Sequence, residues 1–176
     1  MVRWLIMPRG INVGKYNRVP MPELKQSLLA SGFADVVTIG QSGNIIATKP
    51  GTEKELTAQV HELILAEFGV DVPVIVRSEA EVRAVLEVNP LAQTATDGSK
   101  YLAIFLSESP AKERVTALET EDYNPEVFKI VDRTAFVWAA NGVKALKLSH
   151  TFMEKHFGFV ATARNWNTLH KIASKL

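Results

Sequence analysis

The first segment with the composition of a binding site is Gly10-Ile11-Asn12-Val13-Gly14-Lys15. It follows an apolar strand-like run and precedes a helical pattern, the context in which backbone N–H groups of a glycine-containing loop can face an anion. It is not a Walker loop, because its glycines are one residue too close and Tyr16 replaces the Mg²⁺-binding hydroxyl. From Arg9 to Val19 the loop has 11 residues, against about two to six in most such connections. The alternative is a connecting loop whose glycines serve its turns.

The second segment runs from Thr162 to Thr168, where Asn165 is suited to begin a helix as its N-cap. Arg164 would then lie at the positive end of that helix, where a lone cation is unfavourable. With an anion present, the guanidinium and the free N–H groups would act together. The alternative is a solvated arginine or one paired with a nearby acid.

The third segment, Gln41-Ser42-Gly43-Asn44, lies between two β-prone runs and differs from a nucleophile elbow at its last position. Since a strand rather than a helix follows, we do not assign Ser42 as a nucleophile. The four histidines lack metal-ligand spacing and there is no cysteine, so we predict no metal site. No residue pattern indicates a particular cofactor or catalytic group.

We predict that these three segments meet at one polar site, because converged amide and guanidinium donors form an anion site. The candidate ligand-binding residues are Arg9, Asn12, Gly14, Lys15, Asn17, Gln41, Ser42, Asn44, Arg164 and Asn165.

Periodicity and capping signals predict the elements that must position these residues. Strand patterns occur at residues 2–7, 36–39, 44–48 and 72–76, and helical patterns at residues 22–31 and 53–68. Thr52 with Glu55, and Ser78 with Glu81, have capping-box spacing, so a further helix follows the fourth strand. The order β-α-β-β-α-β is the ferredoxin-like arrangement, with helices covering an antiparallel sheet.

The pattern then repeats. Strands are predicted at 101–106, 127–131, 135–138 and 160–163, with helices after residue 109, at 149–157 and at 166–174. We therefore predict an α+β protein of two ferredoxin-like halves, residues 1–88 and 98–176, joined by a turn-rich linker at 89–97.

The three segments also resemble the bacterial domain-of-unknown-function family numbered 1697. Its members have motifs similar to the segments 9–14 and 41–44 of this chain. They also have a Thr-x-Arg-Asn-Trp pattern, which Thr162 to Trp166 match. The chain departs from the family at Lys15, where a second glycine is usual, and at Leu146, where a serine is usual. The resemblance implies tandem ferredoxin-like halves and no established activity.

Composition limits the classes of function. The net charge of +1 argues against nucleic acid as a partner, although residues 1–40 carry +3 and residues 141–176 carry +5. Pro8 and Arg9 interrupt the first apolar run, so we expect neither a signal sequence nor a membrane segment. With no cysteine, the cytoplasm is the expected location.

Three functions follow as hypotheses. The leading one is a protein that binds a small anionic or phosphate-bearing ligand at the predicted site. The alternatives are an uncharacterised transferase or hydrolase that uses the same site, and an interaction protein that forms oligomers through exposed edge strands. The sequence indicates no oligomeric state.

Overall fold

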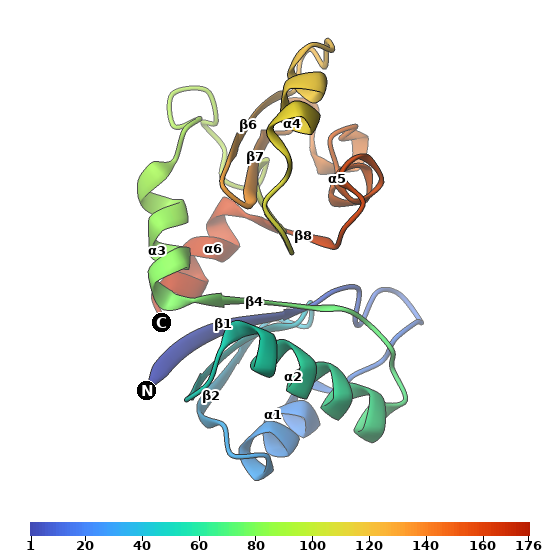
Figure 1. Cartoon of the computed structure of the whole chain (residues 1–176), viewed down its shortest axis with the longest axis vertical. Helices are drawn as coiled ribbons and strands as arrows, with labels where there is room; N and C mark the ends of the chain where they lie inside the picture. The colour runs from blue at the N-terminus through green and yellow to red at the C-terminus, as the bar shows by residue number, and fades with distance from the viewer. The chain divides into compact units, whose positions relative to one another are not determined.

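The first four strands of the chain form one antiparallel sheet with two helices on one face. The computed structural model describes residues 1–176 and gives, in chain order, β1 (Val2–Pro8), α1 (Met21–Ala30), β2 (Ala34–Ile39), β3 (Asn44–Lys49), α2 (Glu53–Phe68) and β4 (Val74–Ser78) (Figure 1). The strand order is β2-β3-β1-β4. This is the order that the ferredoxin-like prediction requires.

The core of this sheet follows from the alternation of side chains along each strand. Ile6 of β1 lies opposite Ile45 of β3 and Val76 of β4 in the register of the sheet. All three are fully buried and pack with Leu24 of α1 and Val60 of α2. One face of the sheet and one face of each helix therefore share a single apolar core.

Local hydrogen bonds set the helix ends as the sequence predicts. The Thr52 backbone N–H donates to the Glu55 carboxylate at 2.8 Å, and the Glu55 N–H donates to the Thr52 hydroxyl at 3.3 Å. Ser78 and Glu81 repeat this exchange at 2.9 and 3.3 Å, at the start of α3 (Glu79–Val88). Both capping-box predictions are confirmed.

The second half repeats the architecture of the first. It contains, in chain order, β5 (Tyr101–Leu106), α4 (Lys112–Glu119), β6 (Val127–Val131), β7 (Thr134–Trp138), the short helix η1 (Val143–Ala145), α5 (His150–Phe157), β8 (Ala161–Asn165) and α6 (Trp166–Ala173). The strand order β6-β7-β5-β8 is antiparallel and matches that of the first sheet. The predicted α+β class with two similar halves is confirmed.

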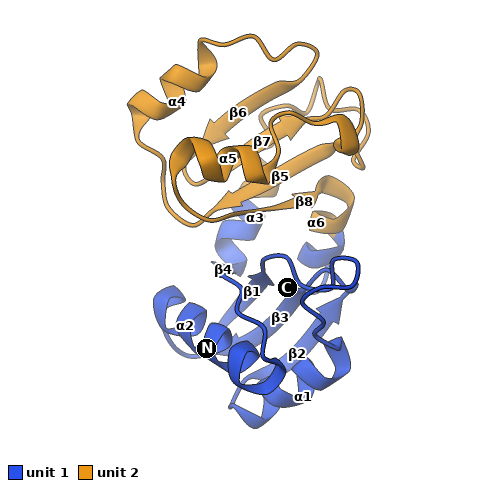
Figure 2. Cartoon of the chain, turned by 90° about the vertical axis from the view of Figure 1, so that its right-hand side faces the viewer, with its two compact units in different colours: residues 1–84, 171–176 blue, residues 85–170 orange.

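Packing divides the chain into two units. Unit 1 comprises Met1–Ala84 with Lys171–Leu176, and unit 2 comprises Val85–His170 (Figure 2). The end of the chain is attached to unit 1, where the Arg3 guanidinium donates to the Lys175 carbonyl at 2.8 and 3.2 Å. None of the helices has the length and apolar character that crossing a bilayer requires.

Strand β8 extends two residues beyond its predicted end. Arg164 and Asn165 lie opposite Ala103 and Leu102 of β5, so strand pairing continues to the first residue of α6. Arg164 is therefore a strand residue, and Asn165 both ends the strand and begins the helix.

Candidate functional site

The loop between β1 and α1 folds back on itself as a small turn. The Tyr16 N–H donates to the Val13 carbonyl at 3.1 Å, and the Asn12 N–H donates to the Asn17 carbonyl at 2.9 Å. Gly14, the second residue of the turn, has a φ of +58°, which a side chain rarely adopts. The conformation suits a type II′ turn, in which only that position has a positive φ.

Two asparagines hold this turn in place. The Asn12 side chain donates to the Val19 carbonyl at 2.9 Å and accepts from the Val19 N–H at 2.8 Å. Its amide group also donates to the Gln41 carbonyl at 2.8 Å, in the β2–β3 hairpin. Asn17 donates to the Gly10 carbonyl at 3.0 Å. The side-chain amides predicted to bind a ligand thus support the loop.

The hairpin that follows β2 packs directly against the loop. Gly43 has a φ of +83°, and a Cβ at this position would lie 2.8 Å from Cδ1 of buried Ile11. The buried Asn44 amide donates to the Ile39 carbonyl at 3.1 Å and to the Ser42 hydroxyl at 3.2 Å. Unit 1 therefore brings two of the three predicted segments together, and Asn44 is a structural residue of the hairpin.

Charged and large side chains remain at the tip of the loop. Lys15 and Arg18 are exposed, and Tyr16 and Val13 are 79% and 62% exposed. Gln41 and Ser42 are exposed on the neighbouring hairpin. Arg9 is half-buried, and its backbone N–H donates to the Pro73 carbonyl at 2.9 Å. The groups that can meet a ligand here are therefore Lys15, Arg18 and their polar neighbours.

The third predicted segment belongs to unit 2. The Arg164 side chain is buried, and its Nη1 donates to the Thr162 hydroxyl and to the Ala163 carbonyl, both at 2.8 Å. Burial lowers the pKa of Arg164 to about 10. Asn165 accepts from the Thr168 N–H at 2.8 Å, which confirms its capping role. That this segment joins the loop and hairpin at one site remains a prediction.

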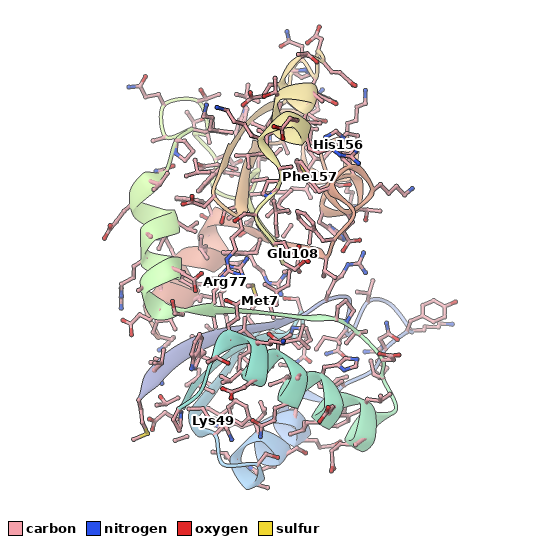
Figure 3. All side chains as sticks on the ribbon, in the orientation of Figure 1. Met7, Lys49, Arg77, Glu108, His156 and Phe157 are labelled. Carbon is pink, nitrogen blue, oxygen red and sulfur yellow. The ribbon has the colours of Figure 1, made fainter.

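Arg77 occupies the corresponding position in unit 1. It is the fourth residue of β4, as Arg164 is of β8, and its Nη1 donates to the carbonyl of the preceding residue, Val76, at 2.8 Å. Arg77 is labelled in Figure 3 and forms an ion pair with Glu53 at 3.4 Å. The repeated order of elements in the sequence is the signal that relates the two arginines.

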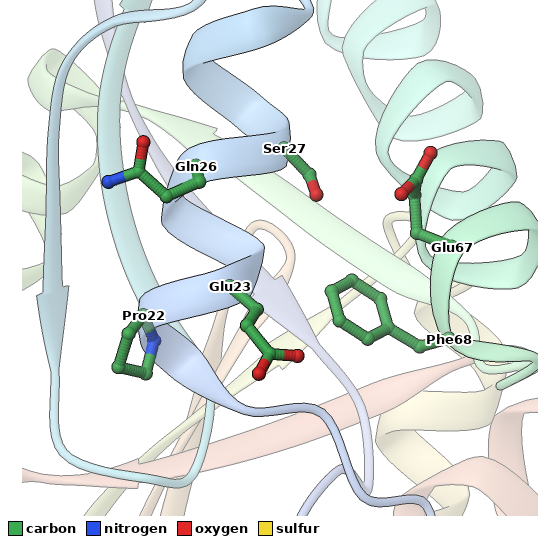
Figure 4. A pocket seen from close by; sticks show the side chains of 6 residues that line it. All are labelled: Pro22, Glu23, Gln26, Ser27, Glu67 and Phe68. Atoms are coloured by element: carbon green, nitrogen blue, oxygen red, sulfur yellow. The ribbon is translucent and has the colours of Figure 1, made fainter.

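A pocket of about 480 Å³ lies between α1 and α2 of unit 1. Figure 4 shows Glu23 and Ser27 on α1 facing Glu67 and Phe68 on α2. The only charged side chains that line the pocket are the two carboxylates, which would repel an anion. This pocket therefore does not suit the ligand class that the sequence predicts.

A second pocket, of about 380 Å³, lies within unit 2. Its polar lining comes from Ser149 and His150 at the start of α5 and from Asn165. No sequence motif joins these residues, so the pocket could not be predicted from the sequence. No group of three His, Cys, Asp or Glu side chains in the structure could hold a metal ion.

The comparisons with known proteins agree with this architecture. A conserved bacterial protein, SP0830 from Streptococcus pneumoniae, has a solved structure that matches 99% of this chain and 98% of its own, with 27% identity and a TM-score of 0.74. The curated proteins include no match. Residues 1–136 match the model of the family described as "Protein of unknown function (DUF1697)". The chain therefore belongs to the DUF1697 family.

Proposed function

We propose that this protein binds a small anionic, phosphate-bearing ligand at the β1–α1 loop and the β2–β3 hairpin of unit 1. The observation that carries the proposal is the pair of exposed cations, Lys15 and Arg18, on a loop that Asn12 and Asn17 support. Charge-assisted hydrogen bonds from such groups to phosphate oxygens are roughly twice as strong as hydrogen bonds between neutral groups.

Preorganisation of the loop favours binding. A flexible loop would lose conformational entropy when it closes on a ligand, and a supported loop has already lost it on folding. Asn12 and Asn17 have φ values of +56° and +52°. This backbone region is unfavourable for residues other than glycine. Such backbone conformations persist where surrounding contacts enforce them, and they cluster at functional sites.

The charge of the surrounding sequence supports an anion. Residues 1–40 carry five basic and two acidic residues, so the loop lies in a basic part of the chain. We place the protein in the cytoplasm, since a chain of 176 residues without cysteine needs no oxidising compartment.

A thermal-shift screen against nucleotides, sugar phosphates and simple anions tests the proposal. A ligand at about 100 times its Kd adds roughly 2.7 kcal/mol to the free energy of unfolding, which such a screen detects. The double variant Lys15→Ala/Arg18→Ala should then bind the best hit at least tenfold more weakly. The matched control, Lys129→Ala/Lys155→Ala, removes two exposed cations from unit 2 and should bind it as the wild type does.

Arg164→Lys tests whether the third segment contributes. Lysine keeps the charge and loses the planar fork of donors, so binding that uses Arg164 should weaken. If none of the screened anions raises the melting temperature, or if the Lys15/Arg18 variant binds the hit as tightly as the control variant, the proposed function is wrong.

A further inference from the structure

The pocket in unit 2 has the dimensions of a small-molecule site. Its volume of about 380 Å³ lies within the range of roughly 300 to 1,000 Å³ that is usual for ligand pockets. It lies on the face of the second sheet that carries α4 and α5. There Leu102 of β5 belongs to the apolar core and Ala163 of β8 packs against it. Every lining residue comes from unit 2, so this site is independent of the loop in unit 1.

The lining combines apolar walls with a few polar groups. Leu102, Val143, Leu146 and Ala163 supply the apolar part. Ser149, His150 and Asn165 supply the polar part, and Ser149 and His150 are adjacent at the start of α5. Ligand pockets have this composition, in which apolar walls bind the body of a molecule and few polar groups orient one end.

The hydrogen bonds already made by the polar groups define what the ligand must offer. The Ser149 hydroxyl accepts from the Phe152 N–H at 3.2 Å, and the Asn165 carbonyl oxygen accepts from the Thr168 N–H at 2.8 Å. Their remaining hydroxyl and amide hydrogens are donors. A ligand that suits these two residues therefore has an acceptor at its polar end.

No carboxylate lines the pocket, so a negative acceptor would meet no charge of its own sign there. Lys144 and Lys147 each follow a lining residue, Val143 or Leu146, in the sequence, and the Lys147 Nζ lies over the Tyr123 ring, 5.1 Å from its centroid. The Glu126 carboxylate accepts from the backbone N–H groups of Lys147 at 2.6 Å and Leu148 at 2.9 Å, so this acid is already bound by backbone donors. A carboxylate in the pocket would thus accept from the Ser149 and Asn165 donors without a competing anion in the lining.

We infer that this pocket binds a small organic carboxylate with an apolar body, whose carboxylate lies against Ser149 and Asn165 and whose body lies along Leu102, Val143 and Leu146. Three probes of six carbon atoms each, with different polar ends, test the inference: hexanoate, 1-hexanol and hexylammonium. Titration calorimetry at neutral pH should give hexanoate at least tenfold higher affinity than hexylammonium, with 1-hexanol between them.

Asn165→Asp is the decisive variant. Aspartate is as good an N-cap as asparagine, so α6 should keep its start and the melting temperature should stay unchanged. The added carboxylate faces the same pocket and should weaken hexanoate binding at least tenfold while strengthening hexylammonium binding. The matched control is Asn167→Asp, which adds the same charge at an exposed position of α6 outside the pocket and should leave both affinities within twofold of wild type.

Val143→Ser tests the apolar wall separately. Val143 is 47% exposed, so its replacement should fold normally and weaken all three probes by a similar factor. Equal affinities of wild type for hexanoate and hexylammonium would overturn the inference. So would an Asn165→Asp variant that folds and keeps its hexanoate affinity, or the absence of hexanoate binding at millimolar concentration. If Asn165→Asp lowers the melting temperature, the Val143→Ser variant decides instead. A Val143→Ser variant that binds hexanoate as tightly as wild type would then overturn the inference.

Discussion

The side chain of Asn12 and the backbone of Val19 exchange two hydrogen bonds, at 2.9 and 2.8 Å, as neighbouring residues of two β-strands do. An asparagine side chain carries one donor group and one acceptor in the spacing of a peptide group, so it can take the place of a backbone peptide group in such a pairing. The second hydrogen of the same amide group reaches Gln41. One residue therefore joins both sides of the loop to the hairpin.

Asn12→Ala should destabilise the protein by about 2 to 4 kcal/mol. It removes three hydrogen bonds worth about 1 kcal/mol each, and alanine tolerates the φ of +56° less well than asparagine. Asn17→Ala removes one such bond and should cost about 1 to 2 kcal/mol. Urea denaturation measures both values, with exposed Asn141→Ala as a control expected within about 0.5 kcal/mol of wild type. A smaller loss for Asn12→Ala than for Asn17→Ala would contradict this account.

Gly43→Ala should destabilise the protein by about 2 to 4 kcal/mol, because it combines an unfavourable φ with a clash against buried Ile11. Gly40→Ala is the matched control, since Gly40 has a φ of +67° but nothing within 4 Å of the added Cβ. It should cost only about 1 to 2 kcal/mol. Ile11→Val removes the clashing Cδ1 atom and should reduce the cost of Gly43→Ala in a double-mutant cycle. Equal costs at Gly40 and Gly43 would rule out the clash.

The stability contributed by Tyr101 should decrease above pH 10. Burial raises the pKa of Tyr101 to about 12, and its ring stacks on Trp166 with centroids 4.3 Å apart. In the unfolded chain the phenol ionises near pH 10, so the contribution is fully present below pH 10 and is lost as the pH rises toward 12. The difference in free energy of unfolding between wild type and Tyr101→Phe should shift against wild type by up to about 3 kcal/mol over this range. A difference in free energy of unfolding that stays constant from pH 9 to pH 12 would show that folding does not raise the pKa of Tyr101.

Arg164→Met should destabilise the protein less than Arg164→Ala does. Burial of the guanidinium has a desolvation cost, which methionine removes while it keeps most of the side-chain volume. We expect a loss within about 2 kcal/mol for methionine and about 2 to 4 kcal/mol for alanine at pH 7, from urea denaturation. An alanine variant as stable as the methionine variant would contradict the expectation.

A comparison of wild type with Arg164→Met at several pH values tests the pKa of Arg164. The folded-state pKa of Arg164, about 10, lies below its ordinary value of 12.5, so above pH 10 the unfolded chain binds more protons at this group. Wild type should therefore gain stability relative to Arg164→Met as the pH rises from 9 to 11. The opposite slope would mean that the folded protein stabilises the charged guanidinium.

The sequence by itself determined the order of the main elements of this protein and the starts of three helices, α2, α3 and α6. Thr52 with Glu55, Ser78 with Glu81, and Asn165 with Thr168 each form hydrogen bonds between residues three apart. Such contacts depend on backbone conformation over one turn, so spacing alone predicts them. Element order, in turn, predicted the two antiparallel sheets.

Only the tertiary structure decided which polar groups stay available to a ligand. The amides of Asn12 and Asn44 look equivalent to that of Gln41 in the sequence, yet both are occupied by backbone carbonyl groups. Arg164 is buried in the folded chain, where β8 sets it opposite Ala103 of β5, 61 positions earlier in the sequence. Burial and pocket shape arise from pairings between distant segments, and their register depends on the packing of the whole sheet rather than on the residues next to each side chain.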